Sequence, residues 1–458
     1  MKQVKLSACK SVLKIDIDGK AYSPISLDVT DTVPADLNGV ELVTVSVNEE
    51  WDCDRLAAKL SQVAATNKKI GVILKATAIN LLTNVKFIEE NFSDSVFGYF
   101  INSTPCKDEI AALSTEYKLF SDKEAFAVFD DFDSVRNAKK RFISAYVEGV
   151  TVCAKSIKEI AGNKLVGAYL LRNTDFNPIN SMIGAIINAL SFAENIDMIC
   201  SPSTNMHSSD SILSSSGSVY KSLAKRNKVW FVEIPSSLAD NKEEIEAITT
   251  YYTLLGKKKE ANPSEVLLIT DEKSWLCVNE NNLLYTICLK NQFDELRSMG
   301  AGYDIYSASD IDEIDLNPYK LIVFLDAFDI NDSVRNFIDK IKTSGKTVLW
   351  IYAPDYVSNG LGGMQHLTDI NIVKLIGDED SVHTHFGVIN FDYLPQPRFF
   401  IEDNDVMPLG IYPNTEKVAI GMKRFSDWTS IYSAVGNINA NTLCNIARIA
   451  GVHISEKM

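Results

Sequence analysis

Glu233 is the residue of this chain whose sequence surroundings best suit chemistry. It lies in residues 228–235, KVWFVEIP, where an apolar run of β-branched and aromatic residues predicts a buried strand. In a (β/α) barrel, the reactive groups lie at the carboxyl ends of the strands, and Glu233 has such a position. The alternative is a glutamate at the rim of the fold, paired with a lysine or an arginine.

The first 260 residues alternate strand-like and helical segments. The strands are predicted at 25–29, 40–47, 69–77, 96–103, 164–171, 196–202 and 228–235. A turn at Asp18-Gly19 predicts an entry hairpin before the first of them. Apolar side chains at three- and four-residue spacing predict a long helix over 133–160. Strands alternating with helices predict a mainly parallel sheet, and here we expect an α/β fold with a (β/α) barrel at 1–260.

Residues 263–368 predict a second domain with a flavodoxin-like or amidotransferase-like open α/β sheet. An amidotransferase needs a cysteine on a sharp strand-to-helix turn, with a histidine partner. The strand ends at 324–328 and 350–355 carry neither residue. We therefore expect a structural domain. Residues 369–458 predict a small β-rich C-terminal portion that ends in a helix.

Composition excludes several classes of function. The 458 residues carry a net charge of -15, which argues against nucleic acid or an anionic membrane as the main partner. No stretch of the chain reaches the roughly 18 uninterrupted apolar residues of a transmembrane helix. The eight cysteines form no CxxC pair. We expect a soluble, cytoplasmic protein without a cofactor. His383 and His385 lack a third ligand at a suitable spacing, so no metal site is expected.

Seven segments occur in an order that is similar to that of a known enzyme family. They are IDMICSPS, KVWFVEIP, SEVLLITDEKSW, YKLIVFLDAF, KTVLWIYAPDYV, SDWTSIYSA and IARIAGVHI. Together they resemble the family-42-like β-galactosidases, glycoside hydrolases with a (β/α)8 barrel and an amidotransferase-like trimerisation domain. The resemblance implies a homo-oligomer, a trimer or a larger assembly.

The resemblance also implies site residues. Retaining glycosidases use two carboxyl groups roughly 5 Å apart, a nucleophile and an acid/base. Glu233 matches the nucleophile at the end of the seventh strand. The acid/base should follow the fourth strand, but this chain has STP at 103–105 where relatives carry an acidic pair before proline. An alternative alignment makes Asp108 or Glu109 the acid.

Two further departures concern the surroundings of Glu233. The family continues this strand with acidic and Arg-Thr residues, whereas IPSS follows here. Relatives have a long segment with the eighth strand before the second domain, and only residues 234–262 remain in this chain. We therefore expect an open or incomplete barrel, which would weaken the preorganisation of a site.

A sugar site would need aromatic platforms beside hydrogen-bonding side chains at the strand ends. The candidates by position are Trp51, Tyr99, Tyr169, Arg172, Asn173 and Asn205. The serine-rich segment 203–222 would cover the barrel mouth, or it is only a surface loop.

Two functions follow from these observations. The first is a degenerate glycosidase, kept as a carbohydrate-binding or assembly-forming component. The absent acid/base, the altered strand ending and the shortened barrel favour it. The second is a working retaining glycosidase that uses Glu233 with Asp108 or Glu109.

Overall fold

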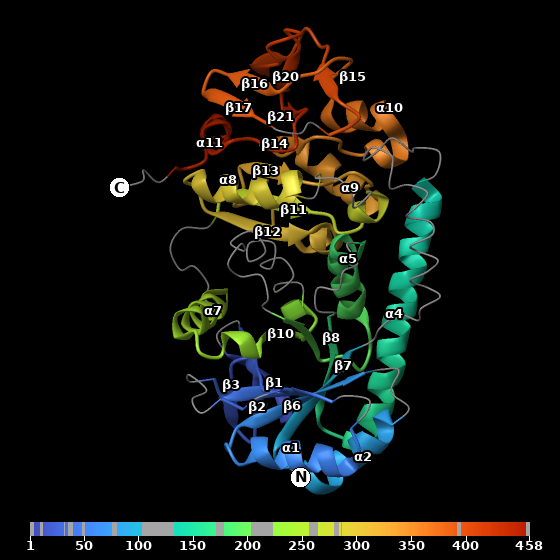
Figure 1. The fold of residues 1–458 in the computed structure, drawn as a ribbon. Coiled ribbons are helices and arrows are strands. Elements are labelled where there is room, and N and C mark those ends of the chain that lie inside the picture. Colours follow the sequence, from blue (N-terminus) through green and yellow to red (C-terminus); the bar gives the residue numbers. More distant parts are fainter. Residues whose placement is uncertain are drawn as a thin grey trace.

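The chain folds into a barrel and a second α/β part stacked along one axis (Figure 1). The computed structural model describes residues 4–9, 12–31, 33–34, 40–47, 51–75, 80–102, 132–170, 178–202, 223–255, 264–278, 284, 286–391 and 395–454. All statements below concern these residues.

A small antiparallel sheet packs against the side chains of the barrel interior in one hydrophobic cluster. It consists of β1 (Val4–Cys9), β2 (Val12–Ile17) and β3 (Lys20–Tyr22). Asp18 and Gly19, at the turn between β2 and β3, have φ angles of 53° and 86°. Positive φ at both central residues is the geometry of a tight hairpin turn, so the predicted entry hairpin is confirmed.

The barrel is closed and has seven parallel strands. They are β4 (Ile25–Asp28), β5 (Leu42–Ser46), β6 (Lys69–Lys75), β7 (Val96–Asn102), β8 (Leu165–Tyr169), β9 (Met198–Pro202) and β10 (Val229–Ile234). Strand β10 pairs directly with β4, with Glu233 opposite Ser26. Of the two expected alternatives, the open barrel is wrong, because the first and last strands pair directly. The incomplete barrel is confirmed, because the described barrel closes with seven strands, without the eighth that the resemblance implies.

Helices cover the outside of the barrel. They are α1 (Cys53–Ala64), α2 (Leu81–Phe92), α4 (Phe132–Ala161), α5 (Pro178–Phe192) and α7 (Lys242–Leu255), with a short 3-10 helix η3 (Ser236–Leu238) after β10. The predicted long helix is confirmed as α4, which runs beside the barrel and up to the second part (Figure 1). Aromatic rings fill the barrel interior, where Phe231 packs against both Phe97 and Phe100.

The second part begins with five parallel strands in flavodoxin-like order. They are β11 (Val266–Thr270), β12 (Tyr303–Ser307), β13 (Leu321–Phe324), β14 (Lys346–Ile351) and β21 (Trp428–Ser433), arranged β12-β11-β13-β14-β21. This is the expected open α/β sheet. Its helical segments are η4 (Ser274–Cys277), η5 (Thr286–Asn291), α8 (Gln292–Ser298), η6 (Ala308–Glu313), α9 (Asp332–Ile341), α10 (Tyr356–Thr368) and α11 (Ala440–Ile449).

Antiparallel strands extend this sheet. They are β15 (Ile372–Lys374), β16 (Ser381–Thr384), β17 (Gly387–Asn390), β18 (Phe399–Ile401), β19 (Met407–Ile411) and β20 (Val418–Arg424). Strand β20 pairs with β21, so the β-rich portion expected at 369–458 shares one sheet with the preceding residues. One hydrophobic core spans both. The boundaries at 260, 263 and 368 as domain limits stay predictions.

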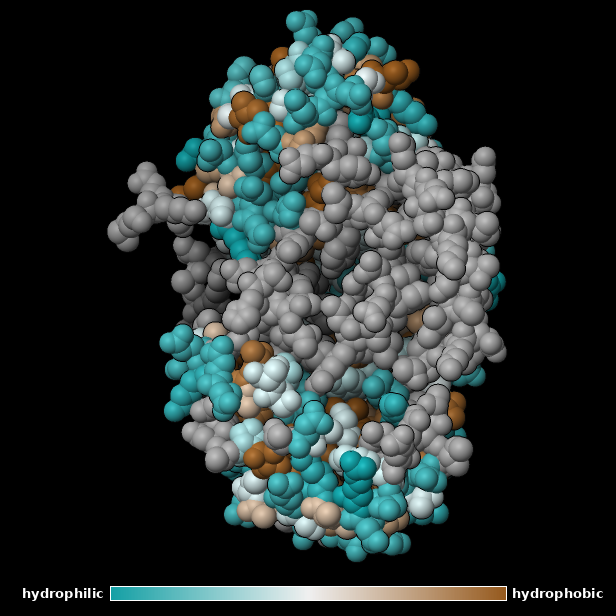
Figure 2. All heavy atoms as spheres, viewed as in Figure 1, coloured by the Kyte–Doolittle hydropathy of each residue, from teal (hydrophilic) through white to brown (hydrophobic). Residues whose placement is uncertain are grey.

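Hydrophilic residues cover most of the described surface that Figure 2 shows, on the barrel and on the α/β part alike. In the described ranges, no helix is both long enough and apolar enough to cross a membrane.

Candidate functional site

Glu233 lies inside the barrel, one residue before the carboxyl end of β10. Its side chain has 0% exposed surface. Its neighbours in the barrel wall are Ser26 of β4 and Pro202 of β9. The carboxyl group thus sits at the end of the barrel where such folds place their chemistry, and not on an exposed rim.

Two hydroxyl groups from other strands reach the two carboxylate oxygens. Thr44 of β5 donates from Oγ1 to Oε1 of Glu233 at 2.7 Å. Tyr169, at the end of β8, donates from its hydroxyl group to Oε2. The Ser26 and Thr44 hydroxyls lie 3.4 Å apart. Four strands therefore build one buried polar layer at the barrel mouth.

Tyr169 is in turn held by helix α4. The hydroxyl group of Tyr146 donates to the main-chain carbonyl of Tyr169 at 3.0 Å. Both side chains are buried, and burial raises the pKa of Tyr146 well above its usual range. The predicted binding residue Tyr169 is thus brought together with the predicted nucleophile Glu233.

Four polar residues of this layer and its surroundings are absent from the sequence-based candidates. Ser26 and Thr44 point inward, as their hydrogen bonds show. Asp28, two residues beyond Ser26 on β4, is buried as well. Asn102 ends β7, and its buried Oδ1 atom has no hydrogen-bond partner among the described residues. Alternation along each predicted strand was the only signal that could have indicated them.

Two candidates lie outside this layer. Tyr99 of β7 points away from the barrel interior, and its hydroxyl group donates to Glu89 of α2 at 2.6 Å. Burial, together with Glu89, raises the pKa of Tyr99 far above its usual range. Trp51 is 9% exposed, packs in the layer between strands and helices, and has Arg55 over its ring. Tyr99 therefore does not line the barrel interior, and its role in sugar binding, like that of Trp51, stays a prediction.

The remaining predicted site residues lie outside the described residues. They are Asp108, Glu109, Arg172, Asn173 and Asn205, together with the segments 103–105 and 203–222.

The strand end at Trp350–Asp355, where an amidotransferase would carry its nucleophile, has a sharp turn. Tyr352 follows β14 with a φ angle of 63°, and its hydroxyl group donates to the Pro397 carbonyl at 2.9 Å. Tyr352 is fully buried. A buried tyrosine thus occupies the strained position of the turn, and it offers no nucleophile to a substrate.

Acidic side chains gather at the carboxyl ends of β11 and β13. Burial raises the pKa of Asp271 to about 6 and that of Glu272 to about 7, and it raises the pKa of Asp326 well above its usual range. Asp326 accepts from the Asp271 amide at 2.7 Å and from the Trp275 indole at 2.7 Å. Among the described side chains, no group of three or more His, Cys, Asp or Glu is arranged to hold a metal ion.

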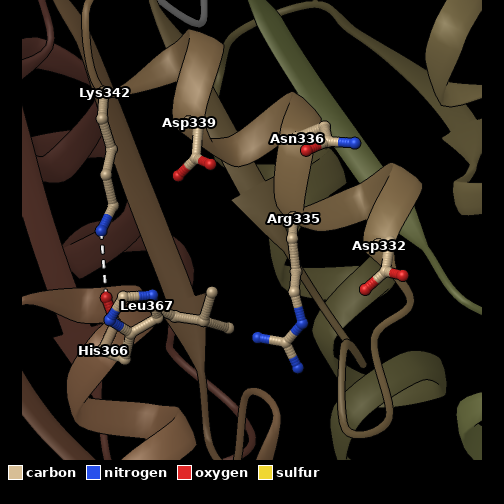
Figure 3. Close-up of a pocket in the computed structure, with 7 residues that line it drawn as sticks. All are labelled: Asp332, Arg335, Asn336, Asp339, Lys342, His366 and Leu367. Atoms are coloured by element: carbon tan, nitrogen blue, oxygen red, sulfur yellow. Dashed lines mark hydrogen bonds between the residues drawn. The ribbon is translucent and has the colours of Figure 1, made fainter.

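A polar pocket of about 240 Å³ lies between helices α9 and α10 (Figure 3). Its lining residues are Asp332, Arg335, Asn336, Asp339, Lys342, His366 and Leu367. Arg335 is paired with buried Asp355 at 2.7 Å, and Lys342 with Asp369 at 2.7 Å. Because Arg335 and Lys342 already form ion pairs with carboxylates, the pocket has no strong preference for an anion. Glu233 does not line this pocket.

Comparison with solved structures identifies the fold. A β-galactosidase from the haloarchaeon Halorubrum lacusprofundi matches with a TM-score of 0.59 and 12% identity, over 92% of this chain and 87% of that chain. A catalytic mutant of a family-42 β-galactosidase from G. stearothermophilus gives 0.57 and 9%, over 91% and 84%. An exo-β-1,4-mannosidase from Opitutaceae bacterium strain TAV5 gives 0.54 and 11%, over 98% and 100%.

The expected resemblance is therefore confirmed at the level of the fold, which is that of the family-42-like glycoside hydrolases. No protein-family profile matches the sequence. No curated protein matches it either.

Proposed function

We propose that this chain is a degenerate glycoside-hydrolase-like protein that binds carbohydrate, or builds an assembly, without hydrolysing glycosides. The observation that supports this proposal is the enclosure of Glu233. Its side chain has no exposed surface, and hydroxyl groups of Thr44 and Tyr169 occupy both oxygens. A carboxylate used in this way stabilises the barrel mouth, whereas a nucleophile must reach an anomeric carbon.

A working retaining glycosidase is the second candidate, because Glu233 still stands at the carboxyl end of its strand, where the chemistry of (β/α) barrels is placed. In that case Glu233 is the nucleophile, and Asp108 or Glu109 supplies the acid. Both proposals place the protein in the cytoplasm as a homo-oligomer, a trimer or larger.

The experiment that separates the two is hydrolysis of a panel of nitrophenyl glycosides, with β-D-galactoside and β-D-mannoside included. The purified protein is compared with Glu233→Gln and with Glu90→Gln, whose side chain is exposed on α2. Turnover that Glu233→Gln abolishes and Glu90→Gln leaves intact would overturn the first proposal.

Absence of turnover alone does not establish binding, so a glycan array and the particle mass are recorded on the same samples. The first proposal predicts either binding to a glycan of the array, or a regular assembly of uniform mass. A monomer that binds no glycan and cleaves no glycoside would contradict both proposals.

A further inference from the structure

One face of helix α4 is attached to the α/β part. Arg136 donates to Asp329 at 3.1 Å, and the two side chains are 26% and 18% exposed. Lys139 is fully buried, and its ammonium group donates to the carbonyl oxygens of Trp275 at 3.1 Å and Val278 at 2.9 Å. These two carbonyls belong to η4 and to the residue after it, so the contact reaches the folded core of the α/β part.

The same helix supports the candidate site farther along its length. Tyr146 lies seven residues after Lys139, which is two helical turns and about 10 Å along the axis. Its hydroxyl group holds the main-chain carbonyl of Tyr169, whose own hydroxyl group donates to Glu233. Two turns of one helix therefore separate the attachment of the α/β part from the support of the buried carboxyl group.

We propose that Tyr146 is a positioning residue for the Tyr169–Glu233 pair, and that α4 makes the geometry of this pair depend on the docking of the α/β part. Helix α4 packs against β7 and β8 of the barrel and against η4 of the α/β part, and its continuous hydrogen-bonded turns make it a stiff link between them. Displacement of its first turns thus moves Tyr146 and the Tyr169 main chain with it. The proposal rests on the proposed function in one respect, since the pair matters for a carbohydrate only if the barrel mouth binds one.

The test follows the Tyr169 side chain directly and needs no ligand. The ring carbon that bears the hydroxyl group is labelled with ¹³C in all tyrosines of the full chain. The Tyr169 resonance is identified by its loss in Tyr169→Phe, and its response to the pair by Glu233→Gln. Both the chemical shift and its pH profile report the hydrogen bond to Glu233.

Two variants remove the support at its two ends. Tyr146→Phe removes the hydroxyl group that donates to the Tyr169 main-chain carbonyl. Lys139→Met removes the ammonium group that donates to two carbonyl oxygens of the α/β part. We expect both to move the Tyr169 resonance in the direction that Glu233→Gln defines and to alter its pH profile. Lys139→Arg, which keeps a cationic donor, should restore both.

The matched control is Lys155→Met, because Lys155 is exposed on the same helix. It should leave the resonance and its pH profile unchanged. If Lys139→Met does not fold, Arg136→Gln takes its place, since Arg136 is only partly buried and its loss is better tolerated.

An unmoved Tyr169 resonance in folded Tyr146→Phe, or in the folded variant at the attachment to the α/β part, would overturn the coupling. Failure to find a glycan ligand would overturn only the proposed binding function, because the resonance is measured without one. The two proposals can therefore fail separately.

Discussion

Glu233 keeps a carboxyl group away from water, and such a group is stable only when donors reach its oxygens. Thr44 and Tyr169 supply these donors from strands on two sides of the barrel. Both donors are neutral hydroxyl groups. The stability of the polar layer at the barrel mouth thus depends on these two hydroxyl groups and on the shape of their side chains.

Thr44→Val tests this dependence with little change of volume. We expect the free energy of unfolding to fall by about 1–3 kcal/mol, because a buried acceptor loses its donor. Urea denaturation followed by circular dichroism measures the change.

Thr151→Val is the control for this substitution. Thr151 donates within helix α4 to the Val147 carbonyl and is only partly buried. We expect a change within about 0.5 kcal/mol. Equal losses in the two variants would show that the Thr44 hydroxyl has no special role beside Glu233.

Sequence alone could indicate Glu233 but not its partners. Thr44 precedes Glu233 by 189 positions and Tyr169 precedes it by 64. Which hydroxyl groups meet the carboxyl group is decided by the register between strands, which a single sequence does not contain. Tyr169 is a candidate because it lies near the end of its predicted strand, 164–171, and Thr44 is not, because it lies within the strand predicted at 40–47.

At the scale of elements, β7 shows why alternation misplaces some residues. The pairing of β6 with β7 shifts between Ile70 and Gly71, so β7 carries an extra residue there. Phe97 and Phe100 both face the interior, and Tyr99 faces the helices. Strict alternation would have put Phe97 and Tyr99 on one face.

Gly71 makes room for these rings. A Cβ atom at this position would lie 2.8 Å from Cε2 of Phe100 and 3.1 Å from Cζ of Phe97. We expect Gly71→Ala to lower the free energy of unfolding by about 1–3 kcal/mol through overpacking of the barrel interior. Thermal and urea unfolding measure this loss.

Gly362→Ala in helix α10 is the matched control, since a Cβ atom there meets nothing within 4 Å. We expect a neutral or slightly stabilising effect, because alanine favours a helix over glycine. An unchanged free energy of unfolding in Gly71→Ala would mean that the rings can rearrange and that the barrel interior is loosely packed around them.

The strands themselves were predictable, since each barrel strand coincides with an apolar run of the sequence. The closure of the barrel was not predictable, because it depends on the pairing of the first strand, 25–28, with the last, 229–234. The shortened segment after Glu233 suggested an opening. The seven strands instead close on themselves, which shows that a missing strand can be absorbed by a smaller ring.

At the scale of the whole molecule, the barrel meets the α/β part through Leu276 of η4, which packs into the barrel's hydrophobic core, and through charged and polar contacts. Arg226, beside the start of β10, pairs with Asp310 at 2.8 Å, and Asn188 of α5 donates to Ser309 at 2.8 Å. Figure 1 shows α5 rising from the barrel into this junction. Glu272 lies here too, because a Cβ atom on Gly184 of α5 would approach its Cγ atom to 3.0 Å.

Glu272 should make stability fall with rising pH. Burial raises its pKa from 4.5 to about 7, while Asp271 and Asp310 add repulsion and the Ser307 hydroxyl opposes the shift. The folded state therefore binds a proton between these pH values that the unfolded state has released. By linkage, this group's penalty is absent below about pH 4.5, grows as pH rises, and is complete above about pH 7.

Glu272→Gln removes this penalty and keeps the shape of the side chain. Relative to the unmodified protein, we expect the variant to gain about 2 kcal/mol in free energy of unfolding between pH 5 and pH 8. Urea unfolding at a series of pH values measures the difference. Glu265→Gln should behave in the opposite way, because hydrogen bonds from Lys320 and the His453 amide lower the pKa of Glu265. A Glu272→Gln difference that does not change with pH would mean that this carboxyl group stays ionised at the junction, and that the contact between barrel and α/β part is open to water there.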